Sequence, residues 1–210
     1  MTASAVTEST WVRASWDNFV TLEDDPAYQR AKFYYHHGCM RVEMSPVGPS
    51  HAQDNGLIAL IIGQWAFKRG LRLYSYVNVT LRKTGQQEAQ PDLACFMGTG
   101  VLPARSNKPV ELSIFLPPVL AVEVSATTLE DDLTTKRELY GELGVSEYWV
   151  VDVKAGQVLL FGLVEGEGLQ PLQGSRVLSG LSPMILSQAL ERGQAQGDAG
   201  VIQYIMDLEQ

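Results

Sequence analysis

The sequence predicts an α/β domain built on a mixed β-sheet. Strand-like and helix-like segments alternate through the middle of the chain, an order typical of helices packed against a sheet that contains parallel strands. A segment with hairpin character precedes this region, and two helix-like segments follow it. The chain has 210 residues, of which 45% are hydrophobic and 19% are charged, as expected for a single globular domain over residues 1–210.

A short helix and a hairpin are predicted near the N-terminus. Ser15 can cap a helix in which Trp16 and Phe19 recur at helical spacing. The following stretch, KFYYHHGCMRVEMSPVG, has two strand-like runs on either side of Gly38 and ends in a proline-containing loop. This pattern predicts a β-hairpin, with Glu43 on its second strand.

A long helix and two strands are predicted next. The stretch SHAQDNGLIALIIGQWAFKRG predicts a helix that Ser50 caps and Gly70 closes. The alternating stretch LRLYSYVNVTLR then predicts one strand. The stretch QPDLACFM predicts another strand, in which Pro91 is tolerated because the first residue of a strand need not donate a hydrogen bond.

The second half of the chain is predicted to contain the central strand of the sheet. The stretch LPPVLAVEVS is apolar on both faces apart from Glu123, the pattern of a central strand covered by helices on both sides. A helix from about Thr128 to Leu143 follows, and then the strands SEYWVVDV and QVLLFGLV. The stretch GEGLQPLQGS is predicted to be a loop, and SPMILSQALERG and DAGVIQYIMDLEQ are predicted to be C-terminal helices.

Composition excludes several classes of protein. The net charge of −8 argues against a protein that coats nucleic acid nonspecifically, so any DNA binding needs a local basic surface or bridging metal ions. The chain has no run of about 18 apolar residues and no signal peptide, and we expect a soluble, cytoplasmic protein without membrane contact. Cys39 and Cys95 lack zinc-site spacing and are expected to be reduced thiols.

Lys136 interrupts the apolar face of the predicted helix. At about 100° per residue, one stripe of this helix contains Leu129, Leu133, Tyr140 and Leu143. Lys136 falls at the centre of this stripe and is therefore aimed at the sheet that carries Glu123. Taken alone, the two charges are more simply a buried ion pair, or a lysine whose ammonium reaches the surface.

Asp92 adds a third charge to this region. At the head of its strand it could simply make a turn hydrogen bond. Adjacent strands would nevertheless bring Asp92 close to Glu123, and two buried carboxylates repel unless one is protonated or a cation lies between them. Mg²⁺ prefers such carboxylates, and a nearby lysine can orient water or stabilise charge on a phosphate. The three residues together predict phosphodiester hydrolysis.

These residues also carry a resemblance to a known family. Pro91-Asp92 followed by Glu123-Val124-Ser125 resembles the signature of the PD-(D/E)xK nuclease superfamily, except that Ser125 stands where that signature has lysine. The chain is similar to the restriction-endonuclease-like family called Uma-two, in which the lysine lies on the following helix, where Lys136 stands here. The resemblance covers most of the chain, and it implies a restriction-endonuclease-like mixed sheet flanked by helices, with a catalytic core at about 30–165.

The resemblance implies roles for four residues. Asp92 and Glu123 would hold Mg²⁺ or Mn²⁺, Lys136 would be the catalytic lysine, and Glu43 would be a further acidic member. By strand alternation Glu43 could equally face solvent.

Two further residues are predicted neighbours of the site. His51 shares a helix face with Ile58 and Ile62, so a hydrogen-bonded histidine near the core is its simpler interpretation. Asp132 lies about 40° from Lys136 around the helix. It could fix the lysine or interact with the helix dipole.

The leading functional hypothesis is a divalent-metal-dependent DNA endonuclease with water as the nucleophile. A homodimer is expected, because two symmetric copies can cut two strands. The alternatives are a noncatalytic binding or assembly module that keeps the three charges as a buried polar network, and a hydrolase of small phosphorylated molecules. A local basic surface for DNA could be formed by Lys32, Lys68, Arg69, Arg72, Arg82, Lys83 and Arg105.

Overall fold

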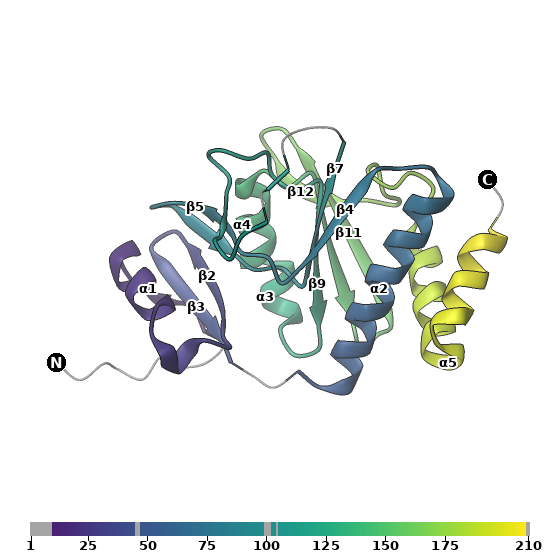
Figure 1. Cartoon of the computed structure of the whole chain (residues 1–210), viewed down its shortest axis with the longest axis horizontal. Coiled ribbons are helices and arrows are strands. Elements are labelled where there is room, and N and C mark those ends of the chain that lie inside the picture. Colours follow the sequence, from purple (N-terminus) through teal and green to yellow (C-terminus); the bar gives the residue numbers. More distant parts are fainter. Residues whose placement is uncertain (1–9, 45–46, 99–101, 104, 209–210) are drawn as a thin grey trace.

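Two six-stranded sheets and the helices packed against them make up the described part of the chain (Figure 1). The computed structural model describes residues 10–44, 47–98, 102–103 and 105–208. Ser45 and Pro46, at the end of the predicted hairpin motif, lie outside the described residues. The structure confirms the predicted α/β class, and its second sheet was not anticipated.

The central sheet contains the strands on which the site prediction depends. Its strand order is β12-β11-β10-β9-β7-β4. The strands are β4 (Leu73–Val77), β7 (Leu93–Met97), β9 (Leu120–Ser125), β10 (Glu147–Asp152), β11 (Gln157–Val164) and β12 (Gly168–Pro171). β9 and β10 pair in parallel and the other neighbours are antiparallel, so the sheet is mixed as predicted.

The N-terminal sheet contains the predicted hairpin. Its order is β1-β3-β2-β6-β5-β8, with strands β1 (Val12–Arg13), β2 (Lys32–His36), β3 (Cys39–Glu43), β5 (Leu81–Lys83), β6 (Gln87–Ala89) and β8 (Val110–Glu111). β2 and β3 are joined by a tight turn in which His37 and Gly38 both have positive φ, 48° and 70°. Helix α1 (Trp16–Glu23) packs on the outer face, and a one-turn 3₁₀ helix (Pro26–Tyr28) follows it. Ser15 accepts a hydrogen bond from the Asn18 N–H, which confirms the predicted cap of α1.

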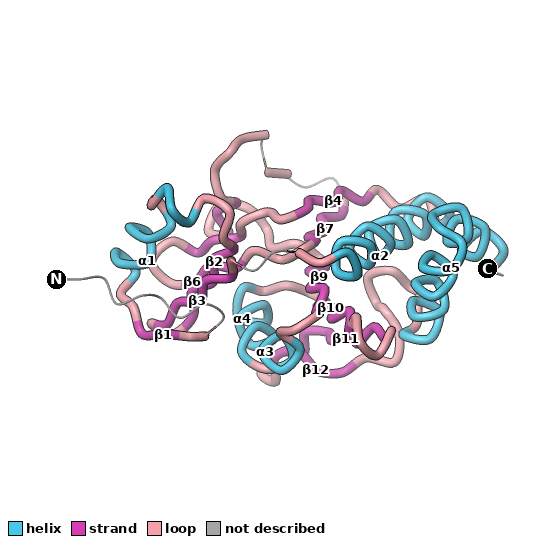
Figure 2. The backbone as a smooth tube through the Cα atoms, turned by 90° about the horizontal axis from the view of Figure 1, so that it is seen from below, coloured by secondary structure: helices cyan, strands magenta, loops and turns pink. Residues whose placement is uncertain are grey.

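The two faces of the central sheet are covered by different elements (Figure 2). Helices α2 (Pro49–Lys68) and α5 (Pro183–Asp207) pack on one face, against residues that include Val122 of β9. Helices α3 (Leu129–Leu133) and α4 (Thr135–Leu143) cover the other face. Ala121 of β9 belongs to this second core, to which Tyr34 of β2 also contributes. The prediction that the Glu123 strand is covered on both sides is therefore confirmed.

Two predicted elements are each divided in the structure. The alternating stretch at 71–82 was expected to be one strand, but it forms β4 and β5, which belong to different sheets. Asn78 separates them with a positive φ of 52°, which turns the chain out of the first sheet. The helix expected from Thr128 to Leu143 is divided into α3 and α4 at Thr134, whose φ of −119° and ψ of −93° are not helical.

Smaller differences concern helix ends and one loop. Helix α2 begins at Pro49 with Gly48 at its cap, and not at Ser50, because proline is favoured in the first turn of a helix. The loop predicted at residues 166–175 contains β12. The two predicted C-terminal helices form α5, which is interrupted at Gly197 by a φ of 71° and a ψ of −170°. None of the described helices combines the length with the apolar character that crossing a membrane requires.

Candidate active site

The three charges singled out from the sequence line one cavity. This cavity has a volume of about 690 Å³ and is bounded by both sheets and by the start of α2. Asp92 directly precedes β7, and the antiparallel register that pairs Leu93 with Val122 places it beside Glu123 of β9. Asp92 and Glu123 are each only 3% exposed. Lys136 reaches the same cavity from α4.

Lys136 is held by three carboxylates. Its Nζ lies 2.9 Å from Oδ1 of Asp132, 3.0 Å from Oε1 of Glu43 and 3.8 Å from Oε1 of Glu123. The ammonium also lies 4.2 Å from the centre of the Tyr34 ring, a favourable cation–π position. Burial alone would lower the pKa of Lys136, but the neighbouring carboxylates, with Glu123 the strongest, raise it above its usual range. Lys136 is therefore a fully buried, charged lysine.

Glu123 is a buried carboxyl group with hydrogen bonds on one side. Its Oε1 accepts hydrogen bonds from the hydroxyl groups of Tyr34 at 3.1 Å and Tyr140 at 2.7 Å. Burial raises the pKa of Glu123 to about 8, although Lys136 and Lys32 oppose this shift. Within the described part of the chain, Oε2 accepts no hydrogen bond, so this oxygen remains open to a ligand in the cavity.

Asp92 lies in the opposite electrostatic environment. Its Oδ1 pairs with Nζ of Lys32 at 2.5 Å, and its Oδ2 accepts the Val124 N–H at 2.8 Å and lies 3.3 Å from Nε2 of His51. Burial alone would raise the pKa of Asp92, but His51, Lys32 and the Val124 N–H together lower it below its usual range. Two neighbouring carboxyl groups therefore have pKa values shifted in opposite directions, a feature that is enriched at functional sites.

Glu43 and Asp132 are brought to the site by different elements. Glu43 lies opposite Lys32 in the register of the β2–β3 hairpin, and it lines the cavity. The sequence had left open whether this residue faces solvent. Its pKa is lowered, because Lys136 and Arg41 outweigh the effect of burial. Asp132 lies on α3, four residues before Lys136, and its Oδ2 accepts a hydrogen bond from the Thr128 hydroxyl at 2.6 Å. This arrangement matches the interpretation in which Asp132 fixes the lysine.

Lys32 and Tyr34 were not among the predicted site residues. Both lie on the face of β2 that is turned toward α4, whereas Phe33 and Tyr35 face α1. The alternation in KFYYH contains this signal, but the sequence does not show which face of the hairpin meets the rest of the domain.

The seven basic residues considered for a DNA-binding surface do not all gather on one part of the molecule. Arg82 is paired with Glu23 and Glu88 in the N-terminal sheet, and Nζ of Lys68 donates to backbone carbonyls at the end of α5. These two elements lie at opposite ends of the molecule (Figure 1). Lys32, a member of the predicted basic set, lines the cavity. Arg30, which is not a member of that set, also lines it. The positions of these basic residues in the sequence do not indicate which of them the fold brings together.

The donor atoms around the cavity fit a hard divalent cation. Mg²⁺ and Mn²⁺ prefer oxygen ligands, and Mg²⁺ is usually held by one or two carboxylates together with waters and substrate phosphate. Asp92 and Glu123 both line the cavity, and Oε2 of Glu123 accepts no hydrogen bond from any described residue. The residues present therefore fit such an ion.

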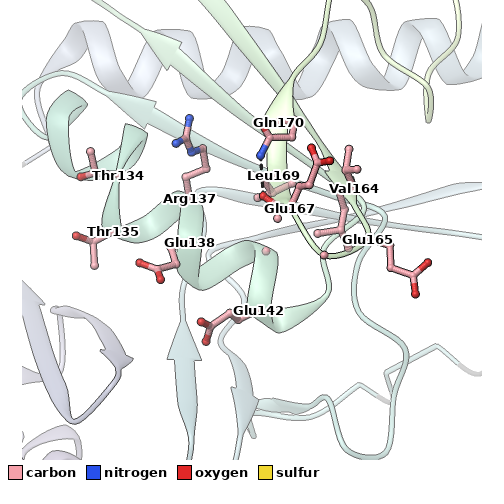
Figure 3. A pocket seen from close by; sticks show the side chains of 14 residues that line it. Thr134, Thr135, Arg137, Glu138, Glu142, Val164, Glu165, Glu167, Leu169 and Gln170 are labelled. Atoms are coloured by element: carbon pink, nitrogen blue, oxygen red, sulfur yellow. Dashed lines mark hydrogen bonds between the residues drawn. The ribbon is translucent and has the colours of Figure 1, made fainter.

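A larger groove lies elsewhere on the molecule. It has a volume of about 1030 Å³ and runs between α4 and the β11–β12 hairpin (Figure 3). Its lining includes Arg137, Glu138 and Glu167, and it does not include Asp92 or Glu123. The groove and the candidate active site are therefore separate.

Comparisons with known proteins agree with this fold. A family model described as "Uma2: Putative restriction endonuclease" matches residues 16–196. A crystal structure described as "a putative nuclease belonging to DUF820 from Anabaena variabilis ATCC 29413" has a TM-score of 0.57 and 16% sequence identity. The match covers 84% of this chain and 98% of the other chain, and at this identity it shows a shared fold. No curated protein matches the chain.

Proposed function

The chain belongs to the Uma2 family, described as a "Putative restriction endonuclease" family, and on this premise we propose that it is a divalent-metal-dependent DNA endonuclease. The observation that carries the proposal is the convergence of Asp92, Glu123 and Lys136 on one cavity from three different elements. A nuclease-like role also agrees with the printed description of the structural neighbour.

In this proposal Asp92 and Glu123 hold Mg²⁺ or Mn²⁺. The ion, when bound, supplies a Lewis acid that polarises the phosphate and lowers the pKa of an attacking water. Tyr34 and Tyr140 fix the orientation of Glu123 through its Oε1, and Oε2 accepts no hydrogen bond from the described residues. The Val124 N–H fixes Asp92 in the same way.

Lys136 is proposed to act on the substrate phosphate or on the attacking water. Asp132 and Glu43 hold its ammonium group in place, so its charge is positioned before the substrate arrives. A preorganised charge of this kind stabilises the negative charge that develops in the transition state without a cost of reorganisation. Lys136 is 1% exposed, and its neighbours Leu139 and Tyr140 on α4 belong to the second core.

Two other functions are each supported by one observation. Lys136 forms an ion pair with Asp132, and Lys32 forms one with Asp92. These pairs support a noncatalytic binding module, in which the charges are kept as a buried polar network. The cavity, at about 690 Å³, is also of a size that accommodates small molecules, which supports a hydrolase of phosphorylated metabolites.

Cleavage of plasmid DNA distinguishes these proposals. The purified protein is incubated with supercoiled plasmid in Mg²⁺, in Mn²⁺ and in EDTA, beside the Asp92→Asn and Glu123→Gln variants. We expect nicked or linear plasmid only with the parent protein and a divalent ion. Release of phosphate from nucleotides with intact plasmid would favour the small-molecule hydrolase. Absence of both activities, together with no binding of Mg²⁺, would favour the noncatalytic module.

A further inference from the structure

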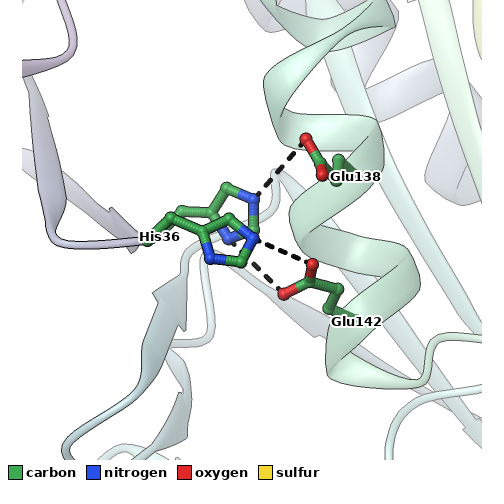
Figure 4. Close-up of side chains that lie close together, drawn as sticks. His36, Glu138 and Glu142 are labelled. Carbon is green, nitrogen blue, oxygen red and sulfur yellow. Dashed lines mark hydrogen bonds and ion pairs between the residues drawn. The ribbon is translucent and has the colours of Figure 1, made fainter.

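Four potential metal ligands gather between the β2–β3 hairpin and α4, outside the cavity of the candidate active site. His36 ends β2, His37 lies in the hairpin turn, and Glu138 and Glu142 are one turn apart on α4. Each offers one ligand atom, and these atoms all lie within 4.8 Å of one another. Figure 4 shows the imidazole of His36 facing Glu138 and Glu142.

His36 is a buried side chain that lacks hydrogen bonds. It is 3% exposed, and within the described part of the chain neither of its ring nitrogens has a hydrogen-bond partner. Nε2 lies 3.8 Å from Oε2 of Glu138, and Nδ1 lies 3.8 Å from Oε2 of Glu142, both beyond hydrogen-bond distance. A buried polar group without a partner is unfavourable, and a bound ion would give the imidazole the partner that it lacks.

The distances in this cluster suit a tetrahedral ion. Zn²⁺ binds imidazole nitrogen and carboxylate oxygen at about 2.0–2.2 Å, so the ligand atoms around it lie about 3.4 Å apart. The four ligand atoms lie within 4.8 Å of one another, and two of them, Nε2 of His37 and Oε1 of Glu142, are 2.9 Å apart. Small side-chain movements would bring all four atoms to one ion.

We propose that His36, His37, Glu138 and Glu142 form a binding site for a transition-metal ion of the Zn²⁺ class. Two imidazoles and two carboxylates are a donor set for Zn²⁺, whereas Mg²⁺ prefers oxygen ligands alone. Gln87 of β6 donates a hydrogen bond to Oε2 of Glu142, which orients that carboxylate and leaves Oε1 for the ion. The side chains of His37 and Glu138 are each 63% exposed, so an ion can enter from solvent.

The site connects the two walls of the candidate active site. Tyr34 lies two residues before His36 on β2, and Lys136 lies two residues before Glu138 on α4. An ion at the cluster would therefore join the strand and the helix whose side chains contact Glu123. Its role is to hold these elements together, and it takes no part in the chemistry at the cavity.

Titration of the metal-free protein with ZnCl₂ tests this proposal directly. We expect calorimetry in excess Mg²⁺ to give one Zn²⁺ ion per chain, and CoCl₂ to produce the intense visible absorption of tetrahedral Co²⁺. His37→Gln and Glu138→Gln alter exposed side chains and should not affect folding. Each should weaken Zn²⁺ binding by about a hundredfold or more, as should His36→Gln.

Two variants serve as matched controls. His51→Gln removes the remaining histidine of the three in the chain, and Cys39→Ser removes the thiol of the residue that lies opposite His36 in the hairpin register. Both should bind Zn²⁺ as the parent does. Unchanged binding in His37→Gln and Glu138→Gln, loss of binding in His51→Gln, or no binding by the parent would overturn the proposal. The titration measures no cleavage, so its result is independent of the endonuclease proposal.

Discussion

The candidate active site contains more carboxyl groups than cations, and this imbalance sets the charge of each residue. Lys136 lies within ion-pair distance of three carboxyl groups, those of Asp132, Glu43 and Glu123. Asp92 is paired with Lys32. The raised pKa of Glu123, about 8, allows this carboxyl group to keep its proton near neutral pH. A divalent cation held by Asp92 and Glu123 would provide the missing positive charge.

Replacement of Lys136 by Met tests whether this lysine is catalytic. The variant keeps most of the alkyl stem and removes the charge. We expect plasmid cleavage to fall by about a hundredfold or more, because a preorganised charge at the transition state is lost. Circular dichroism should show that the fold survives. Cleavage at the parent rate by the folded variant would exclude Lys136 as the catalytic lysine.

A double variant separates catalysis from stability at the same position. Lys136→Met alone leaves Asp132 as a buried carboxylate without its cation, which is expected to cost about 3–5 kcal/mol of unfolding free energy. The further change Asp132→Asn removes that uncompensated charge and should restore much of the stability without restoring cleavage. Recovery of cleavage in the double variant would mean that Lys136 acts only through stability.

Glu123→Gln should change how stability depends on pH. The pKa of Glu123 in the folded protein is about 8, above its unfolded value, so its contribution is full below the unfolded pKa and is lost as pH rises through about 8. This group alone should lower the unfolding free energy by up to about 1.4 kcal/mol per pH unit in that window. Glutamine cannot ionise, so the variant should lose less stability between about pH 5 and about pH 8.

Urea unfolding of the parent and the variant at both pH values measures this difference. Glu88, which is also buried and has a pKa raised to about 8, is present in both proteins, so its contribution cancels in the comparison. Equal pH dependence in the two proteins would show that Glu123 does not bind its proton more tightly in the folded state.

At the scale of elements, the sequence was informative wherever one charge interrupts a regular apolar pattern. Glu123 within an apolar strand and Lys136 within an apolar helix stripe were found in this way, because both periodicities are local. Lys32, Tyr34 and His36 could not be assigned, because the residues that they contact, Asp92, Glu123 and Glu138 in that order, are distant in the sequence. The division of one alternating run into β4 and β5 was missed because alternation does not identify the sheet that a strand joins.

The packing of α5 against α2 gives a prediction at this scale. A Cβ atom at Gly193 of α5 would lie 2.5 Å from Cδ2 of Leu57 and 2.7 Å from Cγ2 of Val201. We expect Gly193→Ala to destabilise the protein by about 1–3 kcal/mol, because side chains in this core must move. Gly63 of α2 is exposed and has open space around it, so Gly63→Ala should stabilise by about 0.5–1 kcal/mol.

Thermal unfolding of the two alanine variants measures this contrast within one pair of helices. Equal stability of Gly193→Ala and Gly63→Ala would contradict the close packing of α5 against α2 at Gly193. The predicted loss at Gly193 depends on the tertiary packing of the helices, since alanine is favoured over glycine at both positions by helix propensity alone.

At the scale of the whole molecule, the acidic balance remains a constraint on DNA binding. The chain carries a net charge of −8, and Arg82, one of the basic residues considered for DNA binding, is paired with Glu23 and Glu88. Nonspecific affinity for DNA should therefore be weak, and binding should depend on the divalent ion.

The expected homodimer is tested on the intact protein. Two copies related by a twofold axis would present two cavities to the two strands of DNA, and twofold dimers are the commonest closed assemblies. Light scattering at micromolar concentration should then give a mass twice the 23.1 kDa of the chain. A monomer, in the presence and absence of DNA, would reject the dimer and leave the proposed chemistry unchanged.

Binding of Mg²⁺ to the folded protein should depend on pH through Glu123. A carboxyl group must lose its proton to ligate a metal, and the pKa of Glu123 is about 8. Below that pH, each unit should weaken apparent affinity about tenfold, which amounts to about 1.4 kcal/mol of stabilisation in excess ligand. The increase in Tm caused by millimolar Mg²⁺ should accordingly be about 3–6 °C smaller for each pH unit below about 8. Calorimetric scans with Mg²⁺ and with EDTA measure this increase in Tm. Asp92→Asn should abolish the increase. His37→Gln, which alters the separate histidine cluster, should retain it. An increase that is independent of pH, or that persists in Asp92→Asn, would place the ion elsewhere on the molecule.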